Sequence, residues 1–261
     1  MLNYKQLYYF WHVARSGGVT RAAQQLHLTP QTISGQVAEL EHSLRHASQE
    51  LTMQVGITAS VPRTLAFELL APAMALATPL RLICHEERPD QLFSELARHK
   101  LDMVLTDRPL PPDSGIRGYN HELGRSPLAL FASPALAAQA RKGFPAALEG
   151  LPVLIPGEKS VTHDRLLAWY HQQGIHPHLV GQFDDSALMK SFGKAGMGIF
   201  PAPLAMGEEI TRVYGVERIA TLPEVTLSYY LVSAGRHLSH PGVKAVMEGA
   251  SQRLAALENK K

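Results

Sequence analysis

The sequence predicts an all-α N-terminal head followed by a larger α/β body, and three observations support this fold class. Residues 4–46 carry apolar side chains at helical spacing. From residue 51 onward, apolar strand-like runs alternate with helical stretches, which favours parallel sheets covered by helices. The 261 residues are 45% hydrophobic and 18% charged, a balance typical of globular proteins.

Two short helices are predicted first. The apolar positions of the first recur at i, i+3, i+4 and i+7, so we expect Leu7, Phe10, Trp11 and Ala14 to face inward. This helix should end at Gly17-Gly18. Thr20 is placed to cap the second helix, which carries Ala22 and Ala23 toward the core.

The third helix has a strong start signal, with Thr29 as the N-cap and Pro30 at the first helical position. Its apolar face carries Ile33, Val37, Leu40 and Leu44. Its polar face carries Gln31, Thr32, Ser34, Gly35 and Gln36. Amide and hydroxyl side chains at a helix start suit the major groove of DNA. A polar face is often merely solvated, but three helices in this pattern favour a helix-turn-helix.

The body is predicted to alternate strands and helices up to residue 257. Strands are expected at 51–57, 80–84, 103–106, 128–131, 153–155, 178–183, 198–200 and 226–232. Helices are expected near 63–76, 90–99, 134–142, 163–173, 185–195, 203–210 and 240–257.

Composition narrows the possible classes of protein. The 25 Lys and Arg nearly balance the 23 Asp and Glu, so charge alone does not indicate nucleic-acid binding. No apolar run approaches the ~18 residues that span a bilayer, and the N-terminus lacks a signal-peptide pattern. The single cysteine, Cys84, excludes an internal disulfide. We therefore expect a cytoplasmic protein without a membrane partner.

Several motifs together resemble the N-terminal head of LysR-type transcriptional regulators. They are LYYFW (7–11), GVTRAAQQL (18–26), TPQTISGQ (29–36) and LE (40–41). The stretches HKLDM (99–103), LIPG (154–157) and FDDSALMK (183–190) resemble one branch of that family, the regulators of sodium/proton antiporters.

The resemblance implies double-stranded DNA as a partner, homo-oligomers, and transcriptional regulation rather than catalysis. The DNA-contacting residues it implies are Arg21, Thr29, Pro30, Gln31, Thr32, Ser34 and Gln36. The branch implies Na⁺ or Li⁺ as an effector, with no other cofactor, and activation of an antiporter gene.

One departure from the family pattern follows the third helix. There the family has an arginine-rich wing and a long linker helix that pairs two subunits. Here Leu44 is followed by only six residues before the strand that begins at Leu51, so both elements look deleted. The predicted domains are a truncated head (1–46), a junction (47–50) and an effector-binding body (51–261). Few Lys and Arg remain in the head, so we expect weakened DNA binding.

The body is expected to resemble a two-lobed periplasmic solute-binding fold. The expected lobes are about 51–130 with 221–261, and about 131–220. Open α/β sheets bind ligands at the carboxyl ends of their strands, and the resemblance places the effector between the lobes. The expected effector-binding residues are Thr58, Ser60, Thr106, Asp107, Phe200 and Pro201. Ser60 is equally well interpreted as a plain N-cap.

Asp184 and Asp185 are weak candidates for a sodium site, because a hard cation prefers oxygen ligands. An aspartate at a helix start is more often a cap. Three histidines at 171, 176 and 178 are better explained by a surface loop than by a metal site. No catalytic constellation is present in the sequence, which argues against an enzyme. An alternative function is an effector-binding module that no longer binds DNA and modulates intact homologues.

Overall fold

The computed structural model describes residues 4–48 and 51–258. The chain divides into two compact units, residues 1–52 with 78–81, and residues 53–77 with 82–261. We call the N-terminal helices the head and everything from Leu51 onward the body. No described helix is long and apolar enough to cross a membrane.

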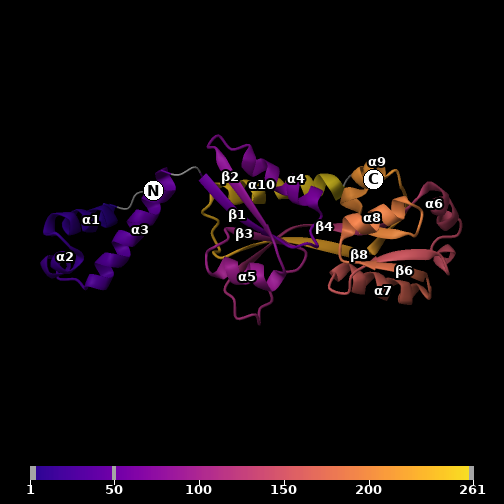
Figure 1. The fold of residues 1–261 in the computed structure, drawn as a ribbon, viewed down its shortest axis with the longest axis horizontal. Coiled ribbons are helices and arrows are strands. Elements are labelled where there is room, and N and C mark those ends of the chain that lie inside the picture. The colour runs from indigo at the N-terminus through magenta and orange to yellow at the C-terminus, as the bar shows by residue number, and fades with distance from the viewer. Residues whose placement is uncertain (1–3, 49–50, 259–261) are drawn as a thin grey trace. The chain divides into compact units, whose positions relative to one another are not determined.

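The head consists of three helices, α1 (Tyr4–Ser16), α2 (Val19–Gln25) and α3 (Pro30–Ser48) (Figure 1). Its core is formed by Tyr9, Ala22, Ala23 and Ile33, with Val13, Val19, Leu26 and Val37 packed against them. The predicted start of α3 is confirmed. The helix extends to Ser48, so it includes two of the four residues assigned to the junction; the other two lie outside the described residues.

The predicted inward face of α1 is wrong. Leu7, Phe10 and Trp11 are 36%, 45% and 50% exposed. The buried positions are Gln6 and Tyr9, one turn apart, because the Gln6 amide donates a 2.7 Å hydrogen bond to Glu39 and so satisfies its buried polar group. The prediction that Thr20 caps α2 is also wrong. The N-cap position is occupied by Gly18, which has no side chain that could accept a hydrogen bond.

The body contains a six-stranded sheet in the order β2-β1-β3-β8-β4-β7. Its strands are β1 (Leu51–Ile57), β2 (Leu80–Glu86), β3 (Met103–Thr106), β4 (Tyr119–Ala132), β7 (Phe200–Pro203) and β8 (Glu217–Ser233). Two further strands, β5 (Pro152–Pro156) and β6 (His178–Phe183), form a parallel pair. The expectation of parallel sheets is correct for this pair and for β1 with β3, but β8 pairs antiparallel with both β3 and β4, as does β7 with β4.

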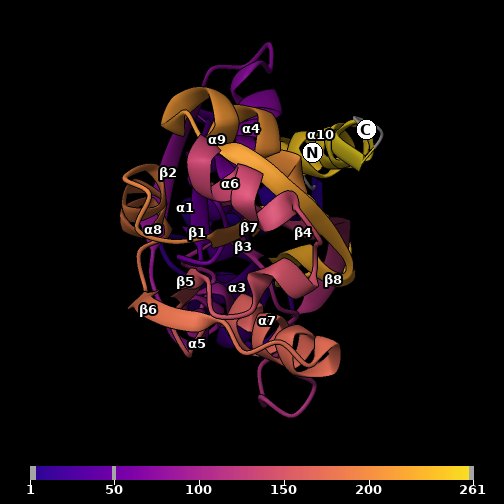
Figure 2. The same ribbon diagram turned by 90° about the vertical axis from the view of Figure 1, so that its right-hand side faces the viewer.

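Seven α-helices of the body lie close to their predicted positions. They are α4 (Arg63–Met74), α5 (Pro89–Ala97), α6 (Pro134–Arg141), α7 (Val161–Gln173), α8 (Ser186–Lys194), α9 (Gly207–Tyr214) and α10 (Pro241–Glu258). Two short 3₁₀ turns lie at Ala146–Leu148 and Leu204–Met206. Both α7 and α8 contact the β5–β6 pair, and Figure 2 shows the pair lying between these two helices.

Two long strands connect the two ends of the body. β4 and β8 pair along nearly their whole length, from Tyr119 opposite Ser233 to Ala132 opposite Glu217. Figure 1 shows them running from the region of β1–β3 toward the region of β5 and β6. The predicted lobe boundaries near residues 130 and 220 therefore fall within continuous strands rather than in loops.

Candidate functional site

The start of α3 is organised by threonine hydroxyl groups. The Thr29 hydroxyl accepts a 3.2 Å hydrogen bond from the backbone N–H of Thr32 and lies 2.7 Å from the Thr32 hydroxyl. This N-cap satisfies one of the backbone donors that a helix start leaves free. The first turn of α3 is consequently held in place before any partner binds.

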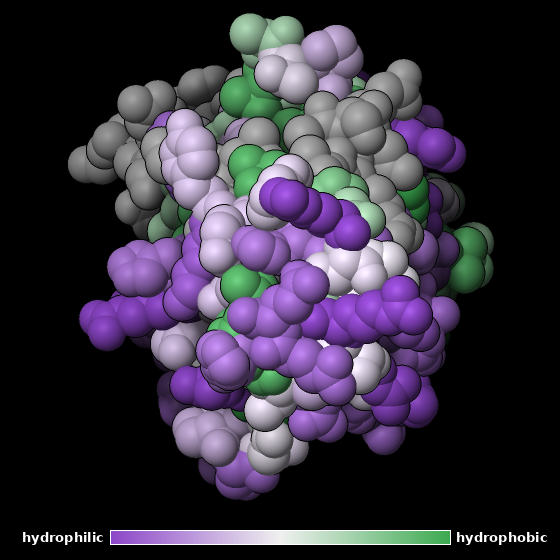
Figure 3. Space-filling view, turned by 90° about the vertical axis from the view of Figure 1, so that its left-hand side faces the viewer, coloured by the Kyte–Doolittle hydropathy of each residue, from purple (hydrophilic) through white to green (hydrophobic). Residues whose placement is uncertain are grey.

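The residues expected to contact DNA mostly lie on the head's surface. Arg21, Thr29, Pro30, Gln31, Thr32 and Ser34 are exposed. Gln36 is half-buried, and its amide donates a 3.2 Å hydrogen bond to Glu39. Figure 3 shows one face of the molecule, whose described surface is largely hydrophilic. The arrangement presents amide and hydroxyl groups outward while Ile33 anchors the opposite face.

The body holds a cavity of about 400 Å³ between loops that follow its strands. Residues after β1 (Thr58, Ser60), after β3 (Arg108) and after β5 (Lys159, Ser160) contribute polar groups. The apolar part of the cavity wall includes Leu128, Pro201 and Leu227. This is the edge at which open α/β sheets bind ligands.

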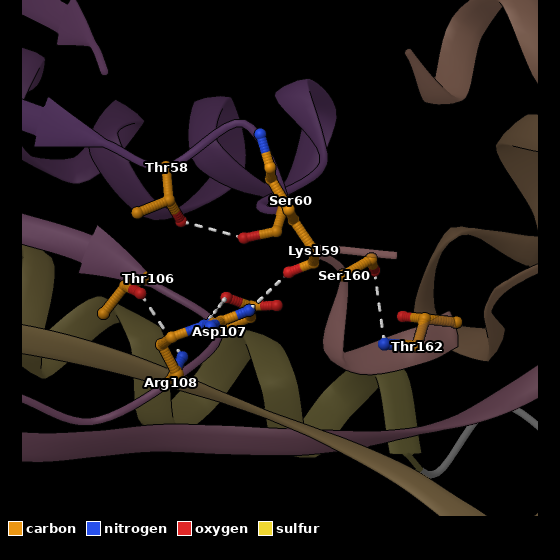
Figure 4. Close-up of polar contacts among 8 residues, drawn as sticks. All are labelled: Thr58, Ser60, Thr106, Asp107, Arg108, Lys159, Ser160 and Thr162. Atoms are coloured by element: carbon orange, nitrogen blue, oxygen red, sulfur yellow. Dashed lines mark hydrogen bonds and ion pairs between the residues drawn. The ribbon is translucent and has the colours of Figure 1, made fainter. Parts of the chain in front are cut away.

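Hydrogen bonds order the cavity wall (Figure 4). The hydroxyls of Thr58 and Ser60 lie 3.0 Å apart. Arg108 donates from Nη2 to the backbone carbonyl of Lys159 at 2.7 Å, which ties the loop after β3 to the loop after β5. The Ser160 hydroxyl caps α7 by accepting from the N–H of Thr162 at 3.2 Å.

The structure separates the predicted effector residues into two groups. Thr58, Ser60 and Pro201 line the cavity. Thr106, Asp107 and Phe200 are buried behind its wall. The Thr106 hydroxyl accepts from the backbone N–H of Arg108 at 3.3 Å, and the Asp107 carboxylate lies 3.7 Å from Arg108 Nε. Thr106 and Asp107 therefore support Arg108.

Phe200 belongs to the hydrophobic core. It is fully buried, and its ring stacks on Phe131 with centroids 5.9 Å apart. Its neighbour Pro201 faces the cavity.

Sequence reasoning missed the cationic side chains of the cavity, which are Arg88, Arg108, Lys159 and Lys190. Two of them, Arg88 and Lys159, lie just before a helix that follows a strand, and Arg108 follows the end of β3, so these positions could have identified three of the four. Lys190 lies in the middle of α8, where its spacing gives no such signal. Burial lowers the pKa of the Lys190 ammonium below its ordinary value, while Glu209 and Asp185 partly offset the effect.

The two weak sodium candidates have different roles. Asp185 caps α8, and its Oδ1 accepts hydrogen bonds from the N–H groups of Ala187 (2.7 Å) and Leu188 (3.2 Å). These bonds hold the pKa of the Asp185 carboxyl below its ordinary value. Asp184 lines the cavity instead. Across residues 4–48 and 51–258, no group of three or more His, Cys, Asp or Glu side chains could hold a metal ion.

Comparisons with known families cover nearly the whole chain. Residues 4–47 match the bacterial regulatory helix-turn-helix protein model of the LysR family, and residues 46–255 match the LysR substrate binding domain. The chain is 30% identical over 285 residues to the transcriptional activator protein NhaR of Escherichia coli K12, with 94% of each chain covered. The NhaR of Shigella flexneri matches equally well.

Solved structures show the same fold. Full-length CbnR complexed with its target DNA aligns with a TM-score of 0.58 at 16% identity, covering 97% of this chain and all of that one. LysG from Corynebacterium glutamicum with bound effector Arg aligns with a TM-score of 0.57 at 18% identity, covering 96% and 99%. Both domain matches and the relation to NhaR agree with the capped third helix and the cavity, and the chain belongs to the LysR family of DNA-binding transcriptional regulators.

Proposed function

We propose that this regulator contacts DNA through the start of α3 and activates transcription in response to a ligand in the body's cavity. The observation that carries the proposal is the capped first turn of α3, which presents Gln31, Thr32 and Ser34 to the exterior. Gln side chains pair with adenine edges, and Ser and Thr hydroxyls reach bases and phosphates. Because the proposed partner is DNA, we propose that the protein acts in the cytoplasm.

We propose domain limits of 1–46 for the head and 51–261 for the body, with the family's wing and linker helix deleted between them. Two findings support the deletion. The two family matches adjoin at residues 46–47. The alignment to NhaR runs over 285 residues although this chain has 261, so part of it faces gaps in this chain.

If the wing and the linker helix are deleted, DNA binding should be weak, and its affinity should change little with salt concentration. Each phosphate contact by Lys or Arg contributes a log–log salt slope of about 0.9. Arg21 is the exposed cation nearest the reading surface in sequence, so we expect few such contacts. A dimer that recognises two DNA half-sites also needs its two heads about 34 Å apart. With the linker helix deleted, that element would not set the distance.

The test is capture of genomic fragments by the full chain, followed by a mobility-shift assay on the captured fragment at several salt concentrations. Gln31→Ala should weaken binding by about 5- to 150-fold, the equivalent of ~1–3 kcal/mol for a base contact. Gln139→Ala is the matched control, because Gln139 is an exposed glutamine on α6 of the body. Equal loss in both variants would contradict base reading by α3.

A second candidate function is an effector-binding module that modulates intact homologues without binding DNA. The proposed deletion favours it, because the wing and the linker helix are the elements that would strengthen DNA binding and pair two heads. Failure to capture any specific fragment, together with co-purification of a full-length homologue, would support this alternative.

Na⁺ or Li⁺ remains a proposed effector that depends on the relation to the antiporter-regulator branch. The capping hydrogen bonds of Asp185 occupy one of its oxygens, which favours a structural role for that residue. Asp184 lines the cavity and is the better of the two candidates.

A further inference from the structure

A carboxylate in the middle of α3 holds two glutamine side chains at once. The Gln6 amide on α1 donates a 2.7 Å hydrogen bond to Oε2 of Glu39, and the Gln36 amide donates a 3.2 Å hydrogen bond to the same oxygen. The two helices contact each other within the head (Figure 1). Glu39 therefore links a residue of α1 to the polar face of α3.

The buried amide of Gln6 keeps Glu39 in place. Gln6 is only 8% exposed, so its amide must find a hydrogen-bond partner inside the head. Glu39 supplies the acceptor, and moving the carboxylate away would leave a buried donor without a partner, which is costly. The carboxylate is consequently anchored beside Gln36 before any partner binds.

The carboxylate also decides which way the Gln36 amide faces. An ionised carboxylate only accepts hydrogen bonds, whereas a glutamine amide has an accepting oxygen and a donating NH₂ group. Turning the amide over would place its oxygen against the carboxylate oxygen of Glu39. Gln36 is thus locked with its NH₂ group toward Glu39 and its Oε1 away from it.

Gln36 lies on the face of α3 that we propose to read DNA. It follows Thr32 by four residues, so the two side chains are neighbours on one face of the helix. Ile33 and Leu40 are fully buried on the other face. Because Glu39 uses one N–H of the Gln36 amide, the second N–H and Oε1 are left for a base.

These two groups fit adenine and do not fit guanine. In the major groove adenine presents an acceptor, N7, beside a donor, the N6 amino group, while guanine presents two acceptors, N7 and O6. The locked amide matches adenine with its second N–H and its oxygen. To match guanine, the amide would have to turn its NH₂ group away from Glu39, which the lock opposes.

We propose that Glu39 is a positioning residue for base recognition, which holds Gln36 in the orientation that reads adenine and rejects guanine. This inference rests on the proposed function in taking α3 as the helix that reads DNA. Glu39 acts through Gln36 and needs no contact of its own with the duplex.

The test is a mobility-shift assay with the full chain and the captured fragment, in which each A·T pair is replaced in turn by G·C. The pair read by Gln36 is the one that Gln36→Ala no longer distinguishes. There the wild type should bind the adenine form about 5- to 150-fold more tightly than the guanine form. Glu39→Ala and Glu39→Gln should lower this ratio about threefold or more, because the hydrogen bond that orients the amide is lost or can form in either direction.

Two further variants separate orientation from charge. Gln6→Leu should also lower the ratio, because it removes the anchor of Glu39 and leaves no buried donor unpaired. Glu41→Gln is the control, since Glu41 is an exposed glutamate two residues further along α3 and its loss removes the same charge. This variant should keep the wild-type ratio. If Glu39 acted only through its charge, its variants would change the affinity for both forms equally.

The lock is also measurable without DNA, in the side-chain amide NMR signals of the free protein. The signals of Gln6 and Gln36 are identified by their loss in Gln6→Leu and Gln36→Ala. Glu39→Ala should shift both signals upfield, because their protons lose a hydrogen bond to a charged acceptor. Glu41→Gln should shift neither.

Unshifted amide signals in Glu39→Ala, or an unchanged ratio in both Glu39 variants, would overturn this inference while the proposed function stands. Loss of binding to every duplex by Glu39→Gln would overturn it as well, because that variant keeps the size of the side chain and an acceptor for Gln6. Failure of the proposed function would appear separately, as absence of fragments captured by the wild type while the amide shifts persist.

Discussion

Gly193 tests how closely α8 is packed over β7. A Cβ at this position would overlap Cδ1 and Cε1 of Phe200 and lie 3.2 Å from its Cγ. Phe200 cannot withdraw, because it is fully buried and stacked on Phe131. Gly193→Ala must therefore displace α8. Overpacking costs about 1–3 kcal/mol, and overlap with two ring atoms places this site in the upper part of that range, about 2–3 kcal/mol. The better helix propensity of alanine returns about 1 kcal/mol. We expect a net loss of about 1–2 kcal/mol in the free energy of unfolding of the body.

Gly35 supplies the matched control. It also lies inside a helix, α3, but a Cβ there would meet nothing within 4 Å, so Gly35→Ala should stabilise the head by about 1 kcal/mol. The assay is urea unfolding followed by tryptophan fluorescence. The chain has two tryptophans, Trp11 in the head and Trp169 buried in α7. A Trp11→Phe background reports on the body and a Trp169→Phe background on the head. An unchanged or higher urea midpoint for Gly193→Ala would refute the packing argument.

Three further predictions concern the stability of single elements. Ile33→Ala should cost the head about 2–5 kcal/mol, because the fully buried side chain leaves a cavity; an unaltered head transition, read from Trp11, would contradict it. Thr29→Ala should cost about 1 kcal/mol through loss of the α3 cap, whereas Thr29→Ser should retain most of it. Asp185→Ala should cost about 1 kcal/mol at pH 7 and Asp185→Asn much less. Because backbone N–H groups lower the folded pKa of Asp185, its stabilisation is complete above the unfolded pKa of about 4 and is lost as pH falls through the lower folded value. The wild-type and Asp185→Ala stabilities should therefore converge under acid, and a constant difference down to pH 2 would contradict the carboxylate's role.

Local signals predicted much of the secondary structure. The strands Met103–Thr106 and His178–Phe183 and the start of α3 at Pro30 were predicted at their observed bounds. A short, mostly apolar and buried run such as Met103–Thr106 and a proline-marked helix start are determined by neighbouring residues. The lengths of β4 and β8 were not predictable in this way, because each strand extends as far as its distant partner continues to pair with it.

The face of α1 shows the limit of periodicity. Its apolar residues are so numerous that two overlapping stripes satisfy helical spacing. The choice between them depends on Gln6, whose burial requires Glu39, 33 residues away. A hydrogen bond across that separation has no signature in the local pattern.

Local signals predicted only part of the candidate site. Thr58 and Ser60 follow β1 directly, and the rule that ligands bind after strands locates them. Lys190 reaches the cavity from the middle of a helix, and only the packing of α8 brings it there. Phe200 and Pro201 are adjacent in sequence, yet alternation of side chains along a strand sends one into the core and leaves the other on the cavity wall.

The pairing of β4 with β8 limits how the body can respond to a ligand. Everything between Ser133 and Val216 leaves along one strand and returns along its antiparallel partner, so this insert is tethered at both ends by the same pair. The pair contains three register shifts, between Glu122 and Gly124, between Pro127 and Leu128, and between Leu130 and Phe131. Such irregularities bend the strand, increase its twist and disrupt the hydrogen-bond ladder only locally. Because both ends of the insert belong to one strand pair, we expect a bound ligand to move it mainly by bending β4 and β8 at these irregularities.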